Sequence, residues 1–126
     1  MAIERINLND PDSGFTFSTC VLAGNFIYTS HQAGMLDELG NKLDTITAQT
    51  VQCFRNLERV LVTAGATLND IVKITVYLRD IHDFSAMRDV YRLHFAHGYP
   101  ARMTATSDFV DEDCLVILDV VAYRTK

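Results

Sequence analysis

The chain has 126 residues, 48% of them hydrophobic, and a formal net charge of -5. These values are typical of a single globular domain, residues 1–126, that is large enough to bury a core of its own. Acidic residues outnumber basic ones and no Lys/Arg cluster is present, which argues against nucleic-acid binding. The sequence contains neither a long apolar run nor a signal-peptide pattern, so we expect a cytoplasmic protein with no membrane partner.

The first predicted elements are a β-hairpin and a loop. Two β-rich runs, residues 15–23 and 26–33, flank Gly24-Asn25, a dipeptide that tolerates positive φ and is typical of tight turns. Residues 34–41 are predicted to form a loop. We therefore expect two adjacent antiparallel strands before the first helix.

A long amphipathic helix is predicted next. Apolar residues recur at intervals of three and four from Val51 to Ala64, which places them on one helix face. Asp44 or Thr45 can cap the first turn of this helix, and Gly65 can end it.

The second half of the chain predicts three strands and a second helix. Residues 71–78 alternate as a strand does. Asp83 then precedes a helical pattern over residues 84–96 and is its expected N-cap. Residues 102–109 and 115–124 supply the last two strands, which an acidic turn connects.

The elements follow the order β-β-α-β-α-β-β, with five strands and two helices. We expect an α+β sandwich in which both helices cover one face of a mixed sheet. Both faces of the last strand, residues 115–124, are substantially apolar, so the helix-free face must be covered as well. We therefore predict a homo-oligomer whose ligand sites lie between subunits.

Cysteine and histidine residues give no sign of a cofactor or metal site. Cys20, Cys53 and Cys114 are far apart in apolar settings, so we expect small buried side chains and neither disulfides nor zinc ligands. His94 and His97 have a spacing that can bind metal, but it is also common at solvated helix ends.

Arg102 is the most informative polar residue. It follows Tyr99-Pro100 and opens a predicted strand, which fixes its guanidinium in a position suited to the bidentate binding of a small carboxylate. The alternative is a solvated surface charge or a structural ion pair.

Several segments together resemble the reactive intermediate deaminase (Rid, YjgF-like) family. The resemblance runs over nearly the whole chain without large gaps. The motifs that carry it are specific when taken together: residues 24–32 (GNFIYTSHQ), 48–50 (AQT), 56–57 (NL), 64–66 (AGA), 70–78 (DIVKITVYL), 83–84 (DF) and 99–102 (YPAR).

This resemblance implies a chorismate mutase-like fold, assembled as a homotrimer with clefts between subunits. The deaminase branch of the family hydrolyses enamines and imines to a 2-keto acid and ammonia and needs no metal or organic cofactor. The arginine that binds the substrate carboxylate in that family falls on Arg102, and the backbone that helps to hold the same carboxylate falls on Ser30 and His31.

Three departures from the deaminase branch fall at the implied site. Phe17 stands where that branch has a tyrosine, which removes a phenol. Ile117 stands where it has the glutamate that orients the attacking water. His31 replaces a glycine, so the backbone N–H is kept and an imidazole that titrates near neutrality is added.

Asp119 and His31 are the remaining candidates for catalysis beside Arg102. Asp119 lies two residues past Ile117, on the same face of the strand. It either orients a shifted water or only makes an ion pair or an interface hydrogen bond. His31 is either a general base or only a polar plug at the mouth of the cleft.

Three further residues have both a binding role and a structural explanation. Thr104 shares a strand face with Arg102 and can hydrogen-bond a ligand, but a β-branched residue also favours strands. Phe84, like Tyr91, either packs helix against sheet or lines the apolar part of the cleft. Arg88 either adds a second cation there or lies on a solvated helix face.

Two classes of function therefore stay open. The first is a Rid-like deaminase that acts on a small imine or enamine with a carboxylate, with a specificity altered by Phe17 and Ile117. The second is a non-catalytic trimeric protein that binds small keto acids or other carboxylates at Arg102.

Overall fold

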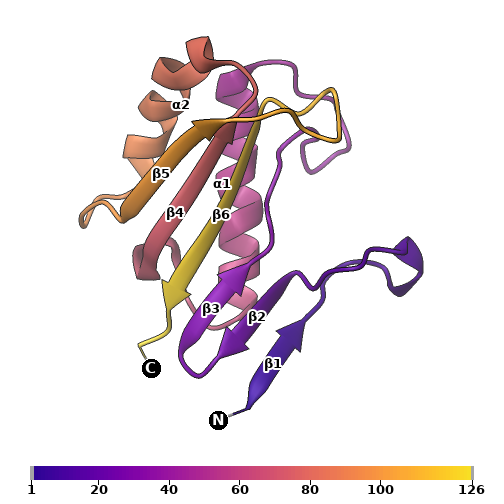
Figure 1. Cartoon of the computed structure of the whole chain (residues 1–126), viewed down its shortest axis with the longest axis vertical. Coiled ribbons are helices and arrows are strands. Elements are labelled where there is room, and N and C mark those ends of the chain that lie inside the picture. The colour runs from indigo at the N-terminus through magenta and orange to yellow at the C-terminus, as the bar shows by residue number, and fades with distance from the viewer. Residues whose placement is uncertain (1, 126) are drawn as a thin grey trace.

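The computed structural model describes residues 2–125, which form one six-stranded mixed sheet (Figure 1). The strand order is β1-β2-β3-β6-β4-β5. The parallel pair is β4 with β5, and every other neighbouring pair in this sheet is antiparallel. The bounds are β1 (Ile3–Ile6), β2 (Cys20–Ala23), β3 (Phe26–Thr29), β4 (Ile71–Leu78), β5 (Ala101–Thr106) and β6 (Val116–Tyr123).

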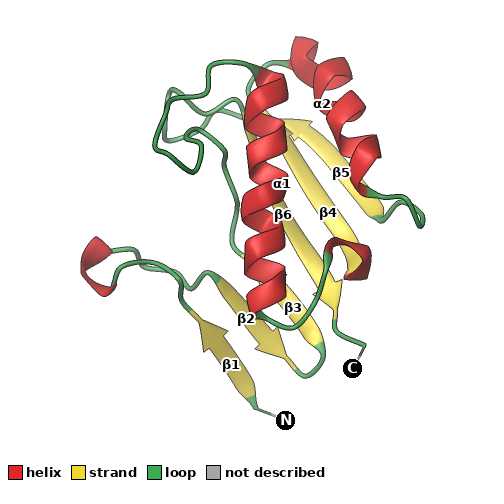
Figure 2. Cartoon of the chain, turned by 180° about the vertical axis from the view of Figure 1, so that it is seen from behind, coloured by secondary structure: helices red, strands yellow, loops and turns green. Residues whose placement is uncertain are grey.

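The helices α1 (Ile46–Thr63) and α2 (Phe84–Tyr91) both cover the same face of the sheet (Figure 2). Thr45 is the N-cap of α1, and its hydroxyl accepts a hydrogen bond from the backbone N–H of Ala48. Gly65 follows the helix with a φ of +89°, in the left-handed region that favours glycine. The α+β sandwich with helices on one face of a mixed sheet is thus confirmed.

The core lies between the helices and the sheet. Phe54, Leu57 and Leu61 of α1 are at most 1% exposed. On β6, Val116, Leu118, Val120 and Ala122 are buried against them, whereas the alternating residues of that strand are half-buried or exposed on the helix-free face. The three cysteines are buried and free, as expected.

A sixth strand, β1, is absent from the predicted order. Its burial is low along its whole length, and Glu4 and Arg5 interrupt the apolar pattern, so the period-2 signal is weak. β1 pairs with β2, with Ile6 opposite Cys20. The prediction of five strands was therefore wrong, because it missed this edge strand.

Several predicted bounds were too long. Residues 15–19 precede β2 as an irregular segment, exposed at 15–17 and buried at Thr19. The ladder of β2 with β1 and β3 begins only at Cys20. The chain leaves β3 after Thr29, and the N–H of Ser30 donates to the carbonyl of Thr19. β5 similarly ends at Thr106, before the predicted residue 109.

The second helix also ends earlier than predicted. α2 stops at Tyr91, and the chain tightens into a 3-10 turn over Arg92–His94. The His94 ring stacks on Phe54 with ring centres 4.1 Å apart, and its Nδ1 lies 3.0 Å from the carbonyl of Val90. His94 therefore packs against the core.

Candidate functional site

The structure divides the predicted site residues between the two faces of the sheet. Arg102 lies opposite Ile74 in the β4–β5 ladder, and Ile74 is buried in the core under the helices. Asp119 lies opposite Thr75 and alternates with buried Leu118. Arg102 thus faces α2, whereas Asp119 faces away from both helices.

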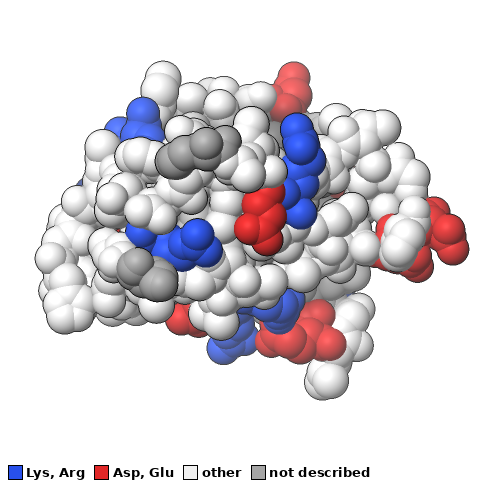
Figure 3. All heavy atoms as spheres, turned by 90° about the horizontal axis from the view of Figure 1, so that it is seen from below, with Lys and Arg blue, Asp and Glu red and all other residues white. Residues whose placement is uncertain are grey.

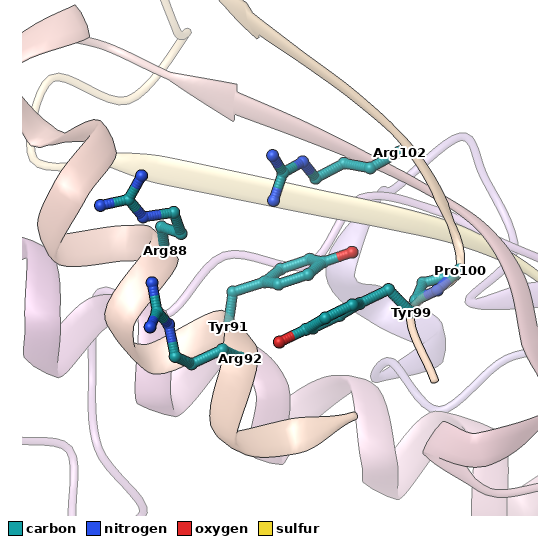
Figure 4. A pocket seen from close by; sticks show the side chains of 6 residues that line it. All are labelled: Arg88, Tyr91, Arg92, Tyr99, Pro100 and Arg102. Carbon is teal, nitrogen blue, oxygen red and sulfur yellow. The ribbon is translucent and has the colours of Figure 1, made fainter. Parts of the chain in front are cut away.

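Arg102 lines a cleft between β5 and α2, which we call the arginine cleft (Figure 4). Its volume is about 400 Å³. The residues that line it are Arg88, Tyr91, Arg92, Tyr99, Pro100 and Arg102.

The guanidinium of Arg102 rests on aromatic rings. Its central carbon lies 4.9 Å from the centre of the Tyr91 ring and 5.6 Å from that of Phe84, distances at which a cation is attracted to a ring face. Within residues 2–125 this guanidinium has no acidic partner, and its charge opposes the burial that raises the pKa of the Tyr91 phenol. Its charge is held in position and is available to an anion.

Phe84 and Thr104 lie beside Arg102. They share a neighbouring cavity of about 620 Å³. The hydroxyl of Thr104 is buried and has no hydrogen-bond partner among the described residues, and such a group costs free energy unless a ligand or water satisfies it. Phe84 both packs against the core and lines this cavity, so its two predicted roles are compatible.

All the other predicted residues except Ser30 line a second pocket on the helix-free face, which we call the His31 pocket. Its volume is about 700 Å³. Among its lining residues are Phe15, Phe17, His31, Tyr77, Ile117 and Asp119. The ring of Phe17 stacks on Phe15 at 5.3 Å and lies 5.8 Å from the ring of His31, measured between ring centres.

The turn at residues 30–31 leaves one backbone donor free. The N–H of Ser30 donates to the carbonyl of Thr19 at 3.0 Å, and its hydroxyl donates to the carbonyl of Ser18 at 2.7 Å. The N–H of His31 has no hydrogen-bond partner within residues 2–125. His31 can therefore offer a backbone donor to a ligand, while both donors of Ser30 serve the fold.

Asp119 is half-buried and has no cation within ion-pair distance in the described part of the chain. Burial raises the pKa of its carboxyl above the ordinary value, against the opposing charges of His31 and Lys73. A carboxylate in such a setting is a better proton acceptor than a solvated one.

We expect this raised pKa to be visible in the stability of the protein. The folded state binds a proton at Asp119 more tightly than the unfolded state, so the free energy of unfolding falls as pH rises from about 3.9 through the folded-state pKa. Asp119→Asn removes this penalty and should stabilise the protein more at pH 7 than at pH 4, in urea unfolding of both proteins. A stabilisation that is equal at both pH values, or larger at pH 4, would contradict the burial argument.

The sequence pattern underestimated two residues of the arginine cleft. Tyr91 is buried beneath Arg102 and stacks with Tyr99 at 6.1 Å between ring centres. Arg88 is exposed to solvent and also lines the same cleft. The i, i+3 spacing of Arg88 and Tyr91, which places both on one side of a helix, was the available signal.

Within residues 2–125 there is no group of three or more His, Cys, Asp or Glu side chains arranged to hold a metal ion. The helices of this part of the chain include none that is long and apolar enough to cross a bilayer.

Comparison with known proteins gives consistent matches along the chain. The family model described as endoribonuclease L-PSP matches residues 7–124, a range that includes the arginine cleft and the His31 pocket. A RutC family protein of Pyrococcus abyssi is 36% identical over 109 residues, which are 86% of each chain. A 2-iminobutanoate/2-iminopropanoate deaminase of Dermatophagoides farinae is 36% identical over 90 residues, which are 70% of each chain.

Solved structures share the fold. RidA from an Antarctic Psychrobacter is 32% identical, with a TM-score of 0.80, and the match covers 90% of this chain and 92% of that one. A protein of unknown function of the conserved Rid family, from Yersinia pestis, is 29% identical with a TM-score of 0.86 over 97% of this chain and 99% of that one.

Proposed function

Because this chain belongs to the Rid (YjgF-like) family, we propose that it hydrolyses a small imine or enamine that bears a carboxylate, giving a keto acid and ammonia. Relatives that match 68 to 70% of the chain are named as deaminases of this kind. The observation that carries the proposal is the guanidinium of Arg102, which lies on two aromatic rings without an acidic partner. That arrangement suits a small carboxylate.

The proposed site is shared between two subunits. Arg102 and the His31 pocket lie on opposite faces of the sheet, so one chain cannot bring them to the same ligand. A head-to-tail ring of identical subunits joins two different surfaces of each copy. We propose a homotrimer, as the family resemblance implies, in which Arg102 of one subunit faces the His31 pocket of the next.

The helix-free face has the composition of an interface. Tyr28, Met103 and Tyr123 are 48%, 58% and 39% exposed in the single chain. Large apolar side chains exposed together on one face mark an interaction surface. A second copy that covers this face would also exclude water from the His31 pocket.

The reaction requires only a few tasks of the protein. The imine carbon is already electrophilic, so the site has to hold the carboxylate, orient one water and accept its proton. Arg102 and the N–H of His31 would bind the carboxylate. The water oxygen adds to the imine carbon, and Asp119 accepts a proton from the water and returns it to the nitrogen. The C–N bond then breaks as the remaining hydroxyl gives its proton to the departing nitrogen, so that ammonia leaves and the carbonyl forms.

We assign the role of general base to Asp119, because the side chain of Ile117 cannot accept a proton. Ile117 lines the same pocket but has no polar atom, and Asp119 is the next residue on that strand face. The imidazole of His31, whose charge acts on Asp119, can assist the proton transfer.

A second candidate is a binding protein without turnover. The observation that favours it is Ile117, which leaves the position of the water-orienting acid of the deaminase branch apolar. Such a protein would keep the Arg102 anchor and bind keto acids.

The test is the hydrolysis of 2-iminopropanoate or 2-iminobutanoate, generated by an amino-acid oxidase and followed by loss of the imine signal. Acceleration by the native protein that is lost in Arg102→Ala supports the deaminase. No acceleration by the folded native protein, together with binding of 2-oxobutanoate that requires Arg102, supports the binding protein.

Introducing the missing acid should raise activity. General acid–base groups contribute about 100-fold or more where they are well placed, and Ile117→Glu adds one beside Asp119, so we expect an increase of at least about tenfold in kcat. Ile117→Gln, which has the same length without the charge, is the control. Equal rates for Ile117→Glu and the native protein would show that Phe17 or Asp119 also has to change.

The family description that names an endoribonuclease does not lead us to propose RNA as the substrate. The chain carries a net charge of -5, and basic and acidic side chains are interspersed on the face seen in Figure 3. Binding along a phosphate backbone depends on a continuous set of Lys and Arg contacts.

A further inference from the structure

The arginine cleft contains a second guanidinium without an acidic partner. The central carbon of Arg88 lies 5.5 Å from the centre of the Phe84 ring, and that of Arg102 lies 5.6 Å from the same centre. Within residues 2–125 Arg88 makes no ion pair. Arg92, by contrast, lies 3.9 Å from Asp89, so its charge is already balanced.

The two free guanidinium groups come from opposite walls of the cleft. Arg102 projects from β5 and Arg88 from α2 (Figure 4), and both side chains line the same cleft. The Tyr91 and Tyr99 rings, stacked with an interplanar angle of 20°, form the apolar wall beside them. A ligand bound to Arg102 would therefore have Arg88 within the same cleft.

This pair of cations is electrostatically unfavourable without a ligand. Like charges repel, and the repulsion between these two exposed groups grows when a second subunit or a ligand displaces the water around them. A ligand with a single carboxylate neutralises one of them, whereas a ligand with two carboxylates neutralises both. The charge pattern therefore discriminates between the two kinds of ligand.

We propose that Arg88 binds a second carboxylate, so that the preferred ligand of this site is a dicarboxylic 2-imino acid. This inference rests on the proposed role of Arg102 as the anchor of the first carboxylate. Among imino acids formed by oxidation of amino acids, those from aspartate and glutamate carry the second carboxylate. The cleft volume of about 400 Å³ leaves room for such a chain beside Arg102.

The corresponding keto acids test the preference without turnover. Calorimetric titration of the native protein should show 2-oxoglutarate binding at least about tenfold more tightly than 2-oxobutanoate, since a charge-assisted contact of this kind favours binding by a factor of ten or more. Arg88→Ala should abolish this preference, and Arg88→Lys should keep part of it. Arg55→Ala is the matched control, because Arg55 of α1 pairs with Glu38, which lies in the loop before that helix and outside the cleft. The substitution should change neither affinity.

Equal affinities of the native protein for the two keto acids, or a preference that persists in Arg88→Ala, would overturn the inference. The proposed function fails in a different way, namely as the absence of imine hydrolysis by the native protein while keto acids still bind. The two failures are therefore separable.

Discussion

Arg102→Ala is expected to lower kcat/KM for imine hydrolysis by about 100-fold. A charge-assisted hydrogen bond contributes about 1.5 to 3 kcal/mol, and loss of the fixed carboxylate also removes the orientation of the reacting carbon. Arg88 cannot take the place of the Arg102 guanidinium, because it projects from α2 rather than from β5. The measurement is the initial rate of loss of 2-iminopropanoate as a function of its concentration.

Arg102→Lys separates charge from geometry in this experiment. Lysine keeps the positive charge but lacks the planar fork that binds a carboxylate through two parallel hydrogen bonds. We expect an intermediate rate for Arg102→Lys and a native rate for Arg55→Ala. Full activity of a folded Arg102→Ala protein would remove Arg102 from the site.

Gln49→Leu is expected to lower the free energy of unfolding by about 3 kcal/mol or more. Gln49 is 1% exposed. Its Nε2 donates to the carbonyls of Leu43 and Asp113, both at 2.8 Å, and its Oε1 accepts from the N–H of Leu115 at 2.9 Å. The substitution leaves three backbone groups without these partners: one at Leu43, before α1, and two at Asp113 and Leu115, just before β6, the strand that carries Asp119.

Gln52→Leu is the matched control, because Gln52 lies one turn later on the same helix. Its amide donates to the side chains of Glu38 and Asn56, which can turn to water when the partner is lost. We expect a loss below about 1.5 kcal/mol in urea unfolding. Equal losses for the two variants would show that the connections made by Gln49 do not carry this stability.

Local signals predicted the long, regular elements well. The cap at Thr45 marks the start of α1, and the spacing of its apolar residues indicates which face is buried. β4 matches its predicted bounds. β1 could not be predicted from pattern alone, because an exposed four-residue edge strand gains its order from pairing with β2 rather than from its own sequence.

The candidate site was only partly predictable for a similar reason. Alternation along one strand places Ile117 and Asp119 on one face, and Arg102 and Thr104 on one face. Whether those two faces coincide depends on the register between strands, which sets Arg102 opposite Ile74 and Asp119 opposite Thr75. Sequence spacing contains no information on that register, so the separation of the two groups emerges only in the folded chain.

The central claim, a site shared between subunits, is tested most directly by mixing two inactive variants. Arg102→Ala and Asp119→Ala subunits, with different affinity tags, are co-expressed in equal amounts, and the imine hydrolysis of the assembled protein is measured. In a trimer with shared sites, each mixed ring has one intact site, so random assembly should restore about a quarter of the native rate. Mixed assemblies as inactive as either variant alone would contradict the account, because they would place Arg102 and Asp119 in a site built by one chain.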